Sequence, residues 1–279
     1  MLTEATIESW LREDLGHHDV TNDVPGEATG RLVATEPGIA GGIEAAARVF
    51  GTLGVDVDPL VSAGDTVESG EAVLRVTGPA QAVLRAERVA VNVAGHASGV
   101  ATRTREAVDR ATAAAENPPT IAATRKTTPG LRGIEKRAVA AAGGDTHRLD
   151  LSHMVMVKDN HIAELGLDRA VERLQERASF ATNVEVEVES PEMATRAADA
   201  GADIVLLDNM TPETTRRAVD RTPDGVLTEA SGGIDIADVG RYAPTGVDIV
   251  SLGALTHSAP TLDYSFRLRD GSASESRPG

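Results

Sequence analysis

From Thr120 onward, one repeating pattern limits the folds that this chain can adopt. Short runs rich in β-branched residues are each followed by a polar or glycine step and then by a stretch with helical spacing. This alternation is typical of a parallel α/β sheet or barrel, in which the polar ends of the strands collect on one edge. Six such runs occur, fewer than the eight strands of a complete barrel, so we predict an α/β fold with an incomplete barrel. The runs are TIAATRK, MVMVKDN, NVEVEVES, DIVLLDN, VLTEASGG and VDIVSLGA.

Two of the intervening stretches begin and end with residues that are typical of helix ends. Residues 191–202 and residues 212–225 each begin with Pro and reach a Gly near their end. Proline is favoured in the first helical turn, where its missing N–H has no intrahelical partner, and glycine is favoured just past the last turn. We therefore predict a helix in each stretch.

The chain before about residue 113 follows a different pattern. Residues 33–54 predict a strand and a helix, and residues 55–80 predict short strands separated by Gly-Asp and Ser-Gly turns. Residues 82–111 are rich in Ala and Val, lack Pro and have helical spacing, so we predict a helix that bridges two domains. The low-complexity tail, residues 270–279, is predicted to be disordered. The expected division is a small domain with its bridging helix over 1–112, a partial barrel over 113–259, and a segment, 260–279, that packs back onto the small domain.

Composition excludes several classes of protein. The 279 residues include no Cys, so the chain has no disulfide, thiol nucleophile or thiolate metal site. A net charge of −16 and a total of six aromatic residues leave no obvious platform for nucleic acid. No apolar run approaches the ~18 residues of a membrane span, and the amino terminus carries acids where a signal peptide needs bases. We expect a cytoplasmic protein without nucleic-acid or membrane partners.

Positive charge is concentrated in one segment of this acidic chain. The stretch from the TRK sequence to Lys158 contains seven Lys or Arg residues against three acids, and it holds all three lysines of the chain. Arg125, Lys126 and Lys158 each lie at the end of a strand run, so we predict that they belong to a site on the edge of the barrel. Lys136 and Arg137 lie in the middle of a helical stretch, where we predict a solvated face instead.

Two acids are expected to face these cations. Glu187 lies in the VEVEV run, and Asp208 lies at the end of the IVLLD run. Because side chains alternate along a strand, Glu185, Glu187 and Glu189 share one face. An acid within so apolar a run is costly unless it faces a polar cavity or a cation. The alternative is an edge strand whose acids face the solvent.

Small residues follow two further strand runs, the SGG sequence at 231–233 and Gly253. Backbone N–H groups at such turns can bind phosphate. Together with the cations and the two acids, these loops suit an anionic substrate and a phosphorylated one bound with a divalent metal. Phosphoribosyl transfer has these requirements.

At these blocks the chain resembles the quinolinate phosphoribosyltransferase family. The resemblance covers almost the whole chain, and its most specific part is the TRKTTPGLR block followed by the KDNH block. The blocks that carry it, in order, are EDLGHHDVT, RVAVNVAGHASGVAT, TRKTTPGLRGIEKRAVAAAGG, HRLDLSHMVMVKDNH, EVEVES, IVLLDNM, EASGGI and GVDIVSLGALTHS.

The resemblance implies a small N-terminal α/β sandwich domain, a partial α/β barrel and the reaction of quinolinate with phosphoribosyl pyrophosphate (PRPP), which releases pyrophosphate and CO2 during NAD synthesis. It also implies a homodimer with a shared site, with a hexamer as an open alternative. Mg²⁺ is expected to bind mainly through PRPP, with Glu187 and Asp208 as candidate protein ligands. The implied substrate ligands are Arg88 (donated across the dimer), Thr124, Arg125, His147, Arg148, Ser231, Gly232, Gly233, Gly253, Ala254 and His257, and the implied catalytic residues are Lys126, Lys158, Glu187 and Asp208.

The sequence also allows other interpretations of the function. A related phosphoribosyltransferase could use nicotinate, or it could be a paralogue linked to molybdenum transport. A Schiff-base aldolase could use Lys126 or Lys158. The VSAGDTVESGEAV stretch resembles a lipoyl or biotinyl carrier, but residues 1–125 contain no lysine to modify. The seven histidines form no HExxH pattern, which disfavours a metal-binding protein.

The acidic, lysine-poor composition also predicts adaptation to a salt-rich cytosol. Salt screens the repulsion among exposed carboxylates, because the Debye length falls to roughly 3 Å at 1 M ionic strength. We therefore expect the midpoint of thermal unfolding to rise between 0.1 M and 2 M KCl, measured by circular dichroism. Full stability at 0.1 M KCl, with no further rise, would contradict the halophilic interpretation.

Overall fold

The computed structural model of the chain describes residues 2–268, which form two compact units. Unit 1 comprises residues up to Thr102, residues 130–142 and the described residues from Ala259 onward. Unit 2 comprises residues 103–129 and 143–258. The tail predicted to be disordered, 270–279, lies outside the described residues. Among the described helices, none is long and apolar enough to cross a membrane.

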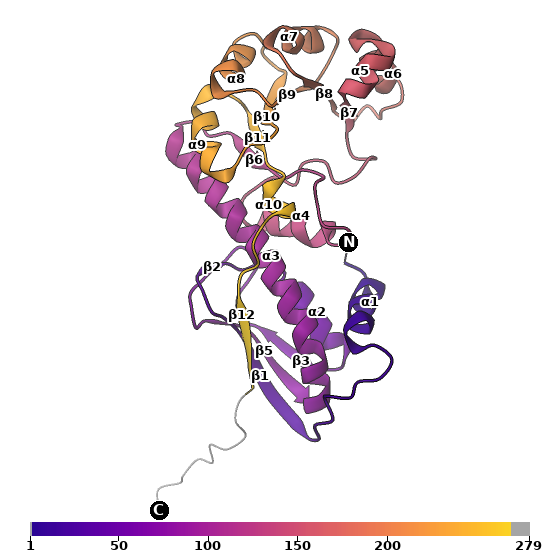
Figure 1. Cartoon of the computed structure of the whole chain (residues 1–279), viewed down its shortest axis with the longest axis vertical. Coiled ribbons are helices and arrows are strands. Elements are labelled where there is room, and N and C mark those ends of the chain that lie inside the picture. Colours follow the sequence, from indigo (N-terminus) through magenta and orange to yellow (C-terminus); the bar gives the residue numbers. More distant parts are fainter. Residues whose placement is uncertain (1, 269–279) are drawn as a thin grey trace, which may run out of the picture. The chain divides into compact units, whose positions relative to one another are not determined.

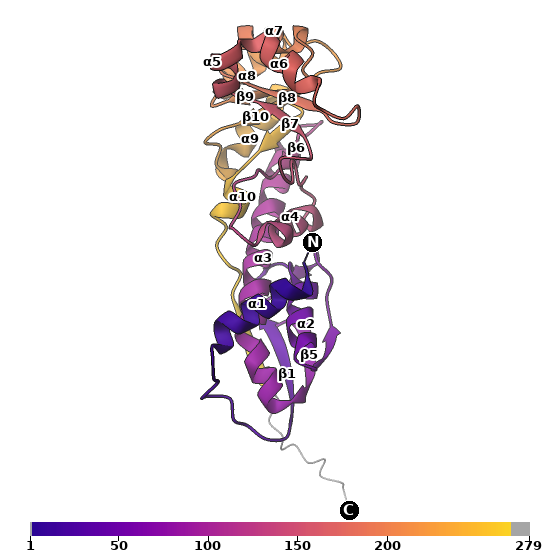
Figure 2. The same cartoon turned by 90° about the vertical axis from the view of Figure 1, so that its right-hand side faces the viewer.

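Unit 1 is built on a four-stranded antiparallel sheet with the strand order β12-β1-β5-β3. Helix α2 packs on β3 and β5 of this sheet, and α1 lies next to α2 (Figure 2). The ring of Phe50, from α2, stacks on that of Phe266, from β12, with 5.7 Å between the ring centroids. A small ribbon pairs β2 with β4. The elements are α1 (Glu4–Leu15), β1 (Glu27–Ala34), β2 (Gly38–Ile39), α2 (Ile43–Thr52), β3 (Asp56–Pro59), β4 (Thr66–Val67), β5 (Ala72–Pro79), the first part of α3 (Ala80–Ala114), α4 (Arg132–Ala141) and β12 (Tyr264–Leu268).

Two glycines in the middle of α3 let the chain that precedes β12 run directly against the helix. A Cβ atom at Gly99 would lie 1.9 Å from the carbonyl oxygen of Pro260, and one at Gly95 would lie 2.9 Å from that of Leu262. The Leu262 N–H donates a hydrogen bond to the carbonyl oxygen of Gly95 at 3.0 Å. Glycine weakens a helix interior, so its use here is explained by this close approach of two backbones.

Unit 2 contains a six-stranded parallel sheet with the strand order β6-β11-β10-β9-β8-β7. In both Figure 1 and Figure 2, helices α5 to α8 lie on one side of strands β7 to β10. The prediction of an incomplete, six-stranded parallel α/β fold is confirmed. Its elements are β6 (Thr120–Ala122), β7 (Val155–Val157), α5 (Asp159–Leu165), α6 (Leu167–Gln175), β8 (Val184–Val188), α7 (Pro191–Asp199), β9 (Ile204–Asp208), α8 (Pro212–Val219), β10 (Leu227–Ser231), η1 (Ile236–Asp238), α9 (Val239–Tyr242), η2 (Ala243–Thr245), β11 (Ile249–Ser251) and α10 (Ala254–His257).

The alternation of β8 decides which side chains enter the core. Val184, Val186 and Val188 are buried in an apolar cluster that includes residues of α7 and α8. The opposite face of the strand therefore carries Glu185 and Glu187. Glu185 is fully buried, so the alternative of an edge strand with solvent-facing acids is wrong for this residue. The prediction of helices beginning at Pro191 and Pro212 is confirmed by α7 and α8.

The division into units differs from the predicted one in two places. The bridging helix is a single element, α3, but it divides between the units after Thr102 instead of ending unit 1 at residue 112. Residues 130–142, which include α4, group with unit 1 although they were predicted in the barrel. The side chains of α4 explain this grouping: Glu135 is buried, and one of its oxygens lies 2.9 Å from Nε2 of His96 on α3. Lys136 is also buried, so its predicted solvated position is wrong, whereas Arg137 is exposed as predicted.

The close approach of the Pro260 backbone to Gly99 of α3 can be tested by substitution. We expect Gly99→Ala to lower the free energy of unfolding by about 1–3 kcal/mol, because the added methyl group overpacks against Pro260. Gly51→Ala in α2 is the matched control, since a Cβ atom there meets nothing within 4 Å, and it should stabilise by up to about 1 kcal/mol. Urea unfolding monitored by circular dichroism measures both, and equal effects of the two substitutions would contradict the close approach.

Candidate active site

A cavity of about 840 Å³ lies in unit 2, lined largely by residues at the carboxyl ends of the parallel strands. Every predicted site residue except Arg88 lines this cavity. Arg88 belongs to unit 1, where it lies on α3 with most of its side chain exposed. The predicted residues that line the cavity are Thr124, Arg125, Lys126, His147, Arg148, Lys158, Glu187, Asp208, Ser231, Gly232, Gly233, Gly253, Ala254 and His257.

The loop after β6 is fixed by the turn after β11. The Lys126 N–H donates to Thr124 Oγ1 at 3.0 Å, and the Thr256 hydroxyl donates to the carbonyl oxygen of Lys126 at 2.6 Å. A Cβ atom at Gly253 would lie 2.9 Å from Cδ of Lys126. Gly253 therefore leaves room for the aliphatic part of the lysine, and the loop holds its ammonium group at the cavity.

Three of the cations in this cavity have no acidic partner among the described residues. Arg125, Lys126 and Arg148 form no ion pair within 4.0 Å there. Arg148 is buried, and one of its guanidinium nitrogens donates to Met156 Sδ at 3.3 Å, a weak acceptor. Burial, and then the charge of Arg125, lower the pKa of Arg148. Lys158 and Arg103 also line the cavity, but they are ion-paired, Lys158 with Glu187 and Arg103 with Glu106. An anion bound among these side chains would offset their mutual repulsion, so the cavity is suited to anionic ligands.

The acidic side of the cavity lies at the end of β9. Asp208 accepts a hydrogen bond from the side-chain amide of Asn209 at 2.7 Å, and the Asn209 N–H donates to the carbonyl oxygen of Ser231 at 3.0 Å. A Cβ atom at Gly232 would lie 2.6 Å from side-chain oxygens of both Asp208 and Asn209. Gly232 has φ of +87°, which also favours glycine. Position 232 in the turn after β10 must therefore be a glycine for the Asp208 carboxylate to reach the cavity.

His147 is held in place by backbone pairing with β6. The Asp145 N–H donates to the carbonyl oxygen of Ile121 at 2.8 Å, and the Ala123 N–H donates to that of Asp145 at 2.9 Å. Asp145 also accepts a hydrogen bond from the His147 N–H at 2.5 Å. His147 has φ of +51°, an uncommon backbone conformation for a residue with a side chain. Such strain is found where the surrounding contacts determine a side chain's position.

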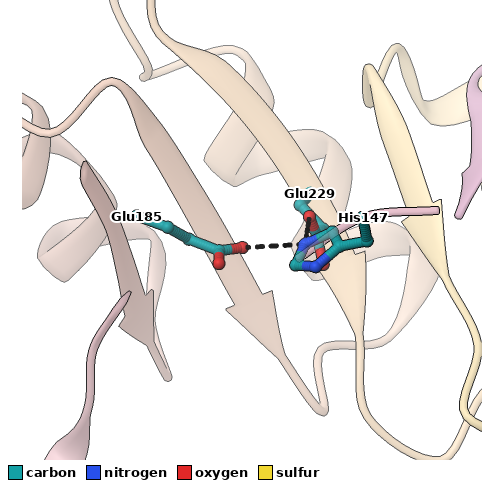
Figure 3. A group of neighbouring side chains, drawn as sticks. All are labelled: His147, Glu185 and Glu229. Carbon is teal, nitrogen blue, oxygen red and sulfur yellow. Dashed lines mark hydrogen bonds and ion pairs between the residues drawn. The ribbon is translucent and has the colours of Figure 1, made fainter. Parts of the chain in front are cut away.

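Two buried carboxylates contact the His147 ring (Figure 3). Nε2 lies 3.0 Å from an oxygen of Glu229 and 3.6 Å from an oxygen of Glu185. Burial alone lowers the pKa of His147, but the two carboxylates more than reverse this effect and raise it to about 10. Burial raises the pKa of Glu185, opposed by the hydrogen-bonding and charge of His147. The potential ligand atoms of the three residues lie within 4.8 Å of one another, a spacing that a metal ion could also span.

Two family profiles match nearly the whole chain. The quinolinate phosphoribosyl transferase N-terminal domain matches residues 18–98, and the C-terminal domain matches residues 100–267. The chain belongs to this family. The resemblance that the sequence blocks indicated is therefore confirmed, and membership of the quinolinate phosphoribosyltransferase family decides against the carrier and aldolase readings.

Relatives of this phosphoribosyltransferase agree with the assignment. The chain is 44% identical over 273 residues to the probable carboxylating nicotinate-nucleotide pyrophosphorylase of Methanothermobacter thermautotrophicus, covering 94% of this chain and 98% of that protein. It is 38% identical over 270 residues to the human carboxylating nicotinate-nucleotide pyrophosphorylase, covering 95% and 91%. Its fold matches the crystal structure of NadC from Streptococcus pyogenes with a TM-score of 0.89 at 37% identity, covering 97% and 99%.

Sequence reasoning did not single out several residues that line the cavity of this phosphoribosyltransferase. Glu229 and Ser251 lie inside β10 and β11, and the Ser251 hydroxyl donates to Glu229 at 2.5 Å. Their signal was a polar residue within a buried parallel strand, the signal that identified Glu187. Arg103 also lines the cavity, but its position in the middle of a predicted helix gave no indication of this; it is ion-paired with Glu106 at 2.7 Å.

The raised pKa of His147 predicts a pH dependence of stability. A group whose pKa is raised on folding contributes stability that is complete below its unfolded value and is lost as pH rises through the folded one. For His147 this loss runs from pH 6.5 to about pH 10. Between pH 7.5 and pH 10, we expect the wild type to lose more free energy of unfolding than His147→Gln, measured with urea. Parallel losses in the two proteins would contradict the raised pKa.

Proposed function

We propose that this chain transfers the phosphoribosyl group of PRPP to quinolinate and decarboxylates the product, which gives nicotinate mononucleotide, pyrophosphate and CO2 for NAD synthesis. The observation that carries this proposal is the group of cations at the strand ends, of which Arg125, Lys126 and Arg148 have no acidic partner among the described residues. Quinolinate carries two carboxylates, and PRPP carries a monophosphate and a pyrophosphate. Both substrates supply the negative charge that the cavity lacks.

The arginines suit the pyridine dicarboxylate. A guanidinium group binds a carboxylate through two parallel hydrogen bonds, so Arg125 and Arg148 can fix both the position and the orientation of a planar ring. The buried position of Arg148 and the strained backbone of His147 favour a rigid binding site. Holding the ring nitrogen near the ribose lowers the barrier to its attack, because little orientational freedom remains to be lost.

The remaining residues suit PRPP. Lys126 and Lys158 are point charges for phosphate oxygens, and the turns at 231–233 and 253–254 offer backbone N–H groups. Glu187 and Asp208 line the same cavity and suit ribose hydroxyls, and their negative charge would stabilise a ribose that becomes cationic during the reaction.

The reaction then proceeds in two steps, transfer of the phosphoribosyl group and loss of CO2. The ring nitrogen of quinolinate forms a bond to C1 of the ribose as the C1–oxygen bond breaks, and pyrophosphate leaves with that electron pair. The ring is now a pyridinium ion, and its positively charged nitrogen stabilises the electron pair that remains on C2 when the 2-carboxylate departs as CO2. A proton then replaces the carboxylate at C2. Because the charged ring itself stabilises this electron pair, the step needs no organic cofactor.

Mg²⁺ fits the acidic side of the cavity. It prefers oxygen ligands and is usually held by one or two carboxylates together with substrate phosphates. Asp208 and Glu187 offer such oxygens, although the ion pair with Lys158 already engages Glu187. When bound, Mg²⁺ would neutralise charge on the pyrophosphate leaving group.

We also propose that the active form is a homodimer in which Arg88 completes the site of the other subunit. The Arg88 side chain is 62% exposed, and its ion pair with Glu87 is long, at 3.8 Å, so little holds it within its own subunit. The resemblance to the family supports this assignment.

The reaction is tested directly with PRPP, quinolinate and Mg²⁺ at high salt, following CO2 and nicotinate mononucleotide. We expect turnover by the wild type and a fall in kcat/KM of roughly 10- to 100-fold in Arg125→Ala and Lys126→Ala, because each loses charge-assisted hydrogen bonds.

Arg137→Ala is the matched control, since Arg137 comes from the same basic segment but is exposed on α4. Its activity should stay within about twofold of the wild type. Turnover of nicotinate but not of quinolinate by the folded wild type would replace the proposed acceptor.

A further inference from the structure

The two buried glutamates beside His147 are unexpected in a cavity that binds anions. The side chain of Glu185 is 0% exposed and that of Glu229 is 1% exposed. Each carboxylate reduces the positive potential that attracts the substrates, and burying it costs free energy. Neither residue belongs to the catalytic or binding sets described above, so a further role has to offset these costs.

The hydrogen bonds of Glu229 define the proton on Nε2 of His147. One oxygen of Glu229 accepts from the Ser251 hydroxyl, and the other lies 3.0 Å from Nε2. Because a carboxylate can only accept, Nε2 carries a hydrogen. A neutral ring would then present a bare lone pair at Nδ1, which repels a carboxylate. The ring can donate to an anionic ligand only as an imidazolium ion.

Glu185 strengthens this state from the other side. Its carboxylate lies 3.6 Å from Nε2 and accepts no hydrogen bond within the described part of the chain. It therefore acts on the ring mainly through its charge. Nδ1 of His147 has no hydrogen-bond partner among the described residues, and His147 lines the cavity. The other charged groups that line this cavity near the end of β8 are Arg148, Lys158 and Glu187.

We propose that Glu185 and Glu229 are positioning residues that keep His147 as a donor at both ring nitrogens, and that this second donor selects an acceptor with two adjacent carboxylates. The inference rests on the proposed function and extends it to the choice of acceptor. A monocarboxylate such as nicotinate leaves one donor of the cavity unpaired, which costs affinity. A dicarboxylate satisfies the arginines and His147 together.

The test compares Glu229→Gln with Glu229→Asp and Glu185→Gln. Gln keeps the size of the side chain but removes its charge, whereas Asp keeps the charge and leaves a small void. We expect Glu229→Gln to raise the KM for quinolinate by roughly tenfold or more and to leave the KM for PRPP within about twofold. Glu185→Gln should shift the same KM in the same direction. Glu229→Asp should bind quinolinate better than Glu229→Gln, the reverse of the order expected from packing alone.

Glu189→Gln is the matched control, because Glu189 is the exposed glutamate of the same VEVEVE run and should leave both KM values unchanged. Benzene-1,2-dicarboxylate, which lacks the reacting nitrogen, provides a readout independent of turnover. By calorimetry it should bind the wild type more tightly than benzoate, and Glu229→Gln should remove this preference. If the wild type shows this pattern but turns over no quinolinate, the proposed function fails while the inference stands.

Three results would overturn the inference. These are equal losses for quinolinate and PRPP, a Glu229→Asp protein weaker than Glu229→Gln, or a wild type that does not prefer the dicarboxylate. Elemental analysis of the purified protein adds a fourth. We expect no stoichiometric transition metal, and one metal ion per chain that is lost in Glu185→Gln would make the cluster a metal site instead.

Discussion

Parallel hydrogen bonding among six strands is the constraint on which the rest of unit 2 depends. It aligns the carboxyl ends of β6 to β11 at one edge, and residues from six separate parts of the sequence meet there. Arginine and lysine would not gather in this way on their own account, because like charges repel. The ladder and the helices packed on its outer side supply the free energy that holds them together. The fold thus holds mutually repelling cations close together in the cavity.

The charge of the whole chain and the charge of the cavity are opposite in sign. A net charge of −16 favours solubility but opposes the approach of two polyanionic substrates. Concentrating the unpaired cations in one concave region resolves this conflict, since low-dielectric walls focus the local field. The buried carboxylates of Glu185 and Glu229 act on the same electrostatic field, but only in the immediate surroundings of His147. These two carboxylates keep the His147 ring protonated, so that it acts as a hydrogen-bond donor at one point of the cavity wall.

The sequence predicted most of the fold and the greater part of the candidate site. Arg125, Lys158 and Asp208 were predictable because each follows a β-branched run, and parallel strands place such positions at one edge. Glu229 was not singled out, since alternation defines two faces of a strand without saying which one is interior. The same reasoning failed for Lys136 on α4, where the pattern of Ala and Val does not reveal that a lysine is buried. The grouping of α4 with unit 1 was missed because it depends on a contact between Glu135 and His96, 39 residues apart.

The late position of β12 in the chain bears on how the protein is made. This strand pairs with β1 at the edge of the unit 1 sheet, yet its residues follow all of unit 2 in the sequence. While the ribosome is still translating unit 2, unit 1 has only three strands of its main sheet, and Phe50 lacks the ring on which it stacks. The open edge of β1 is then available to any other extended chain nearby. Synthesis of β12 both completes the sheet and closes this edge, so unit 1 is completed only after unit 2 has been synthesised.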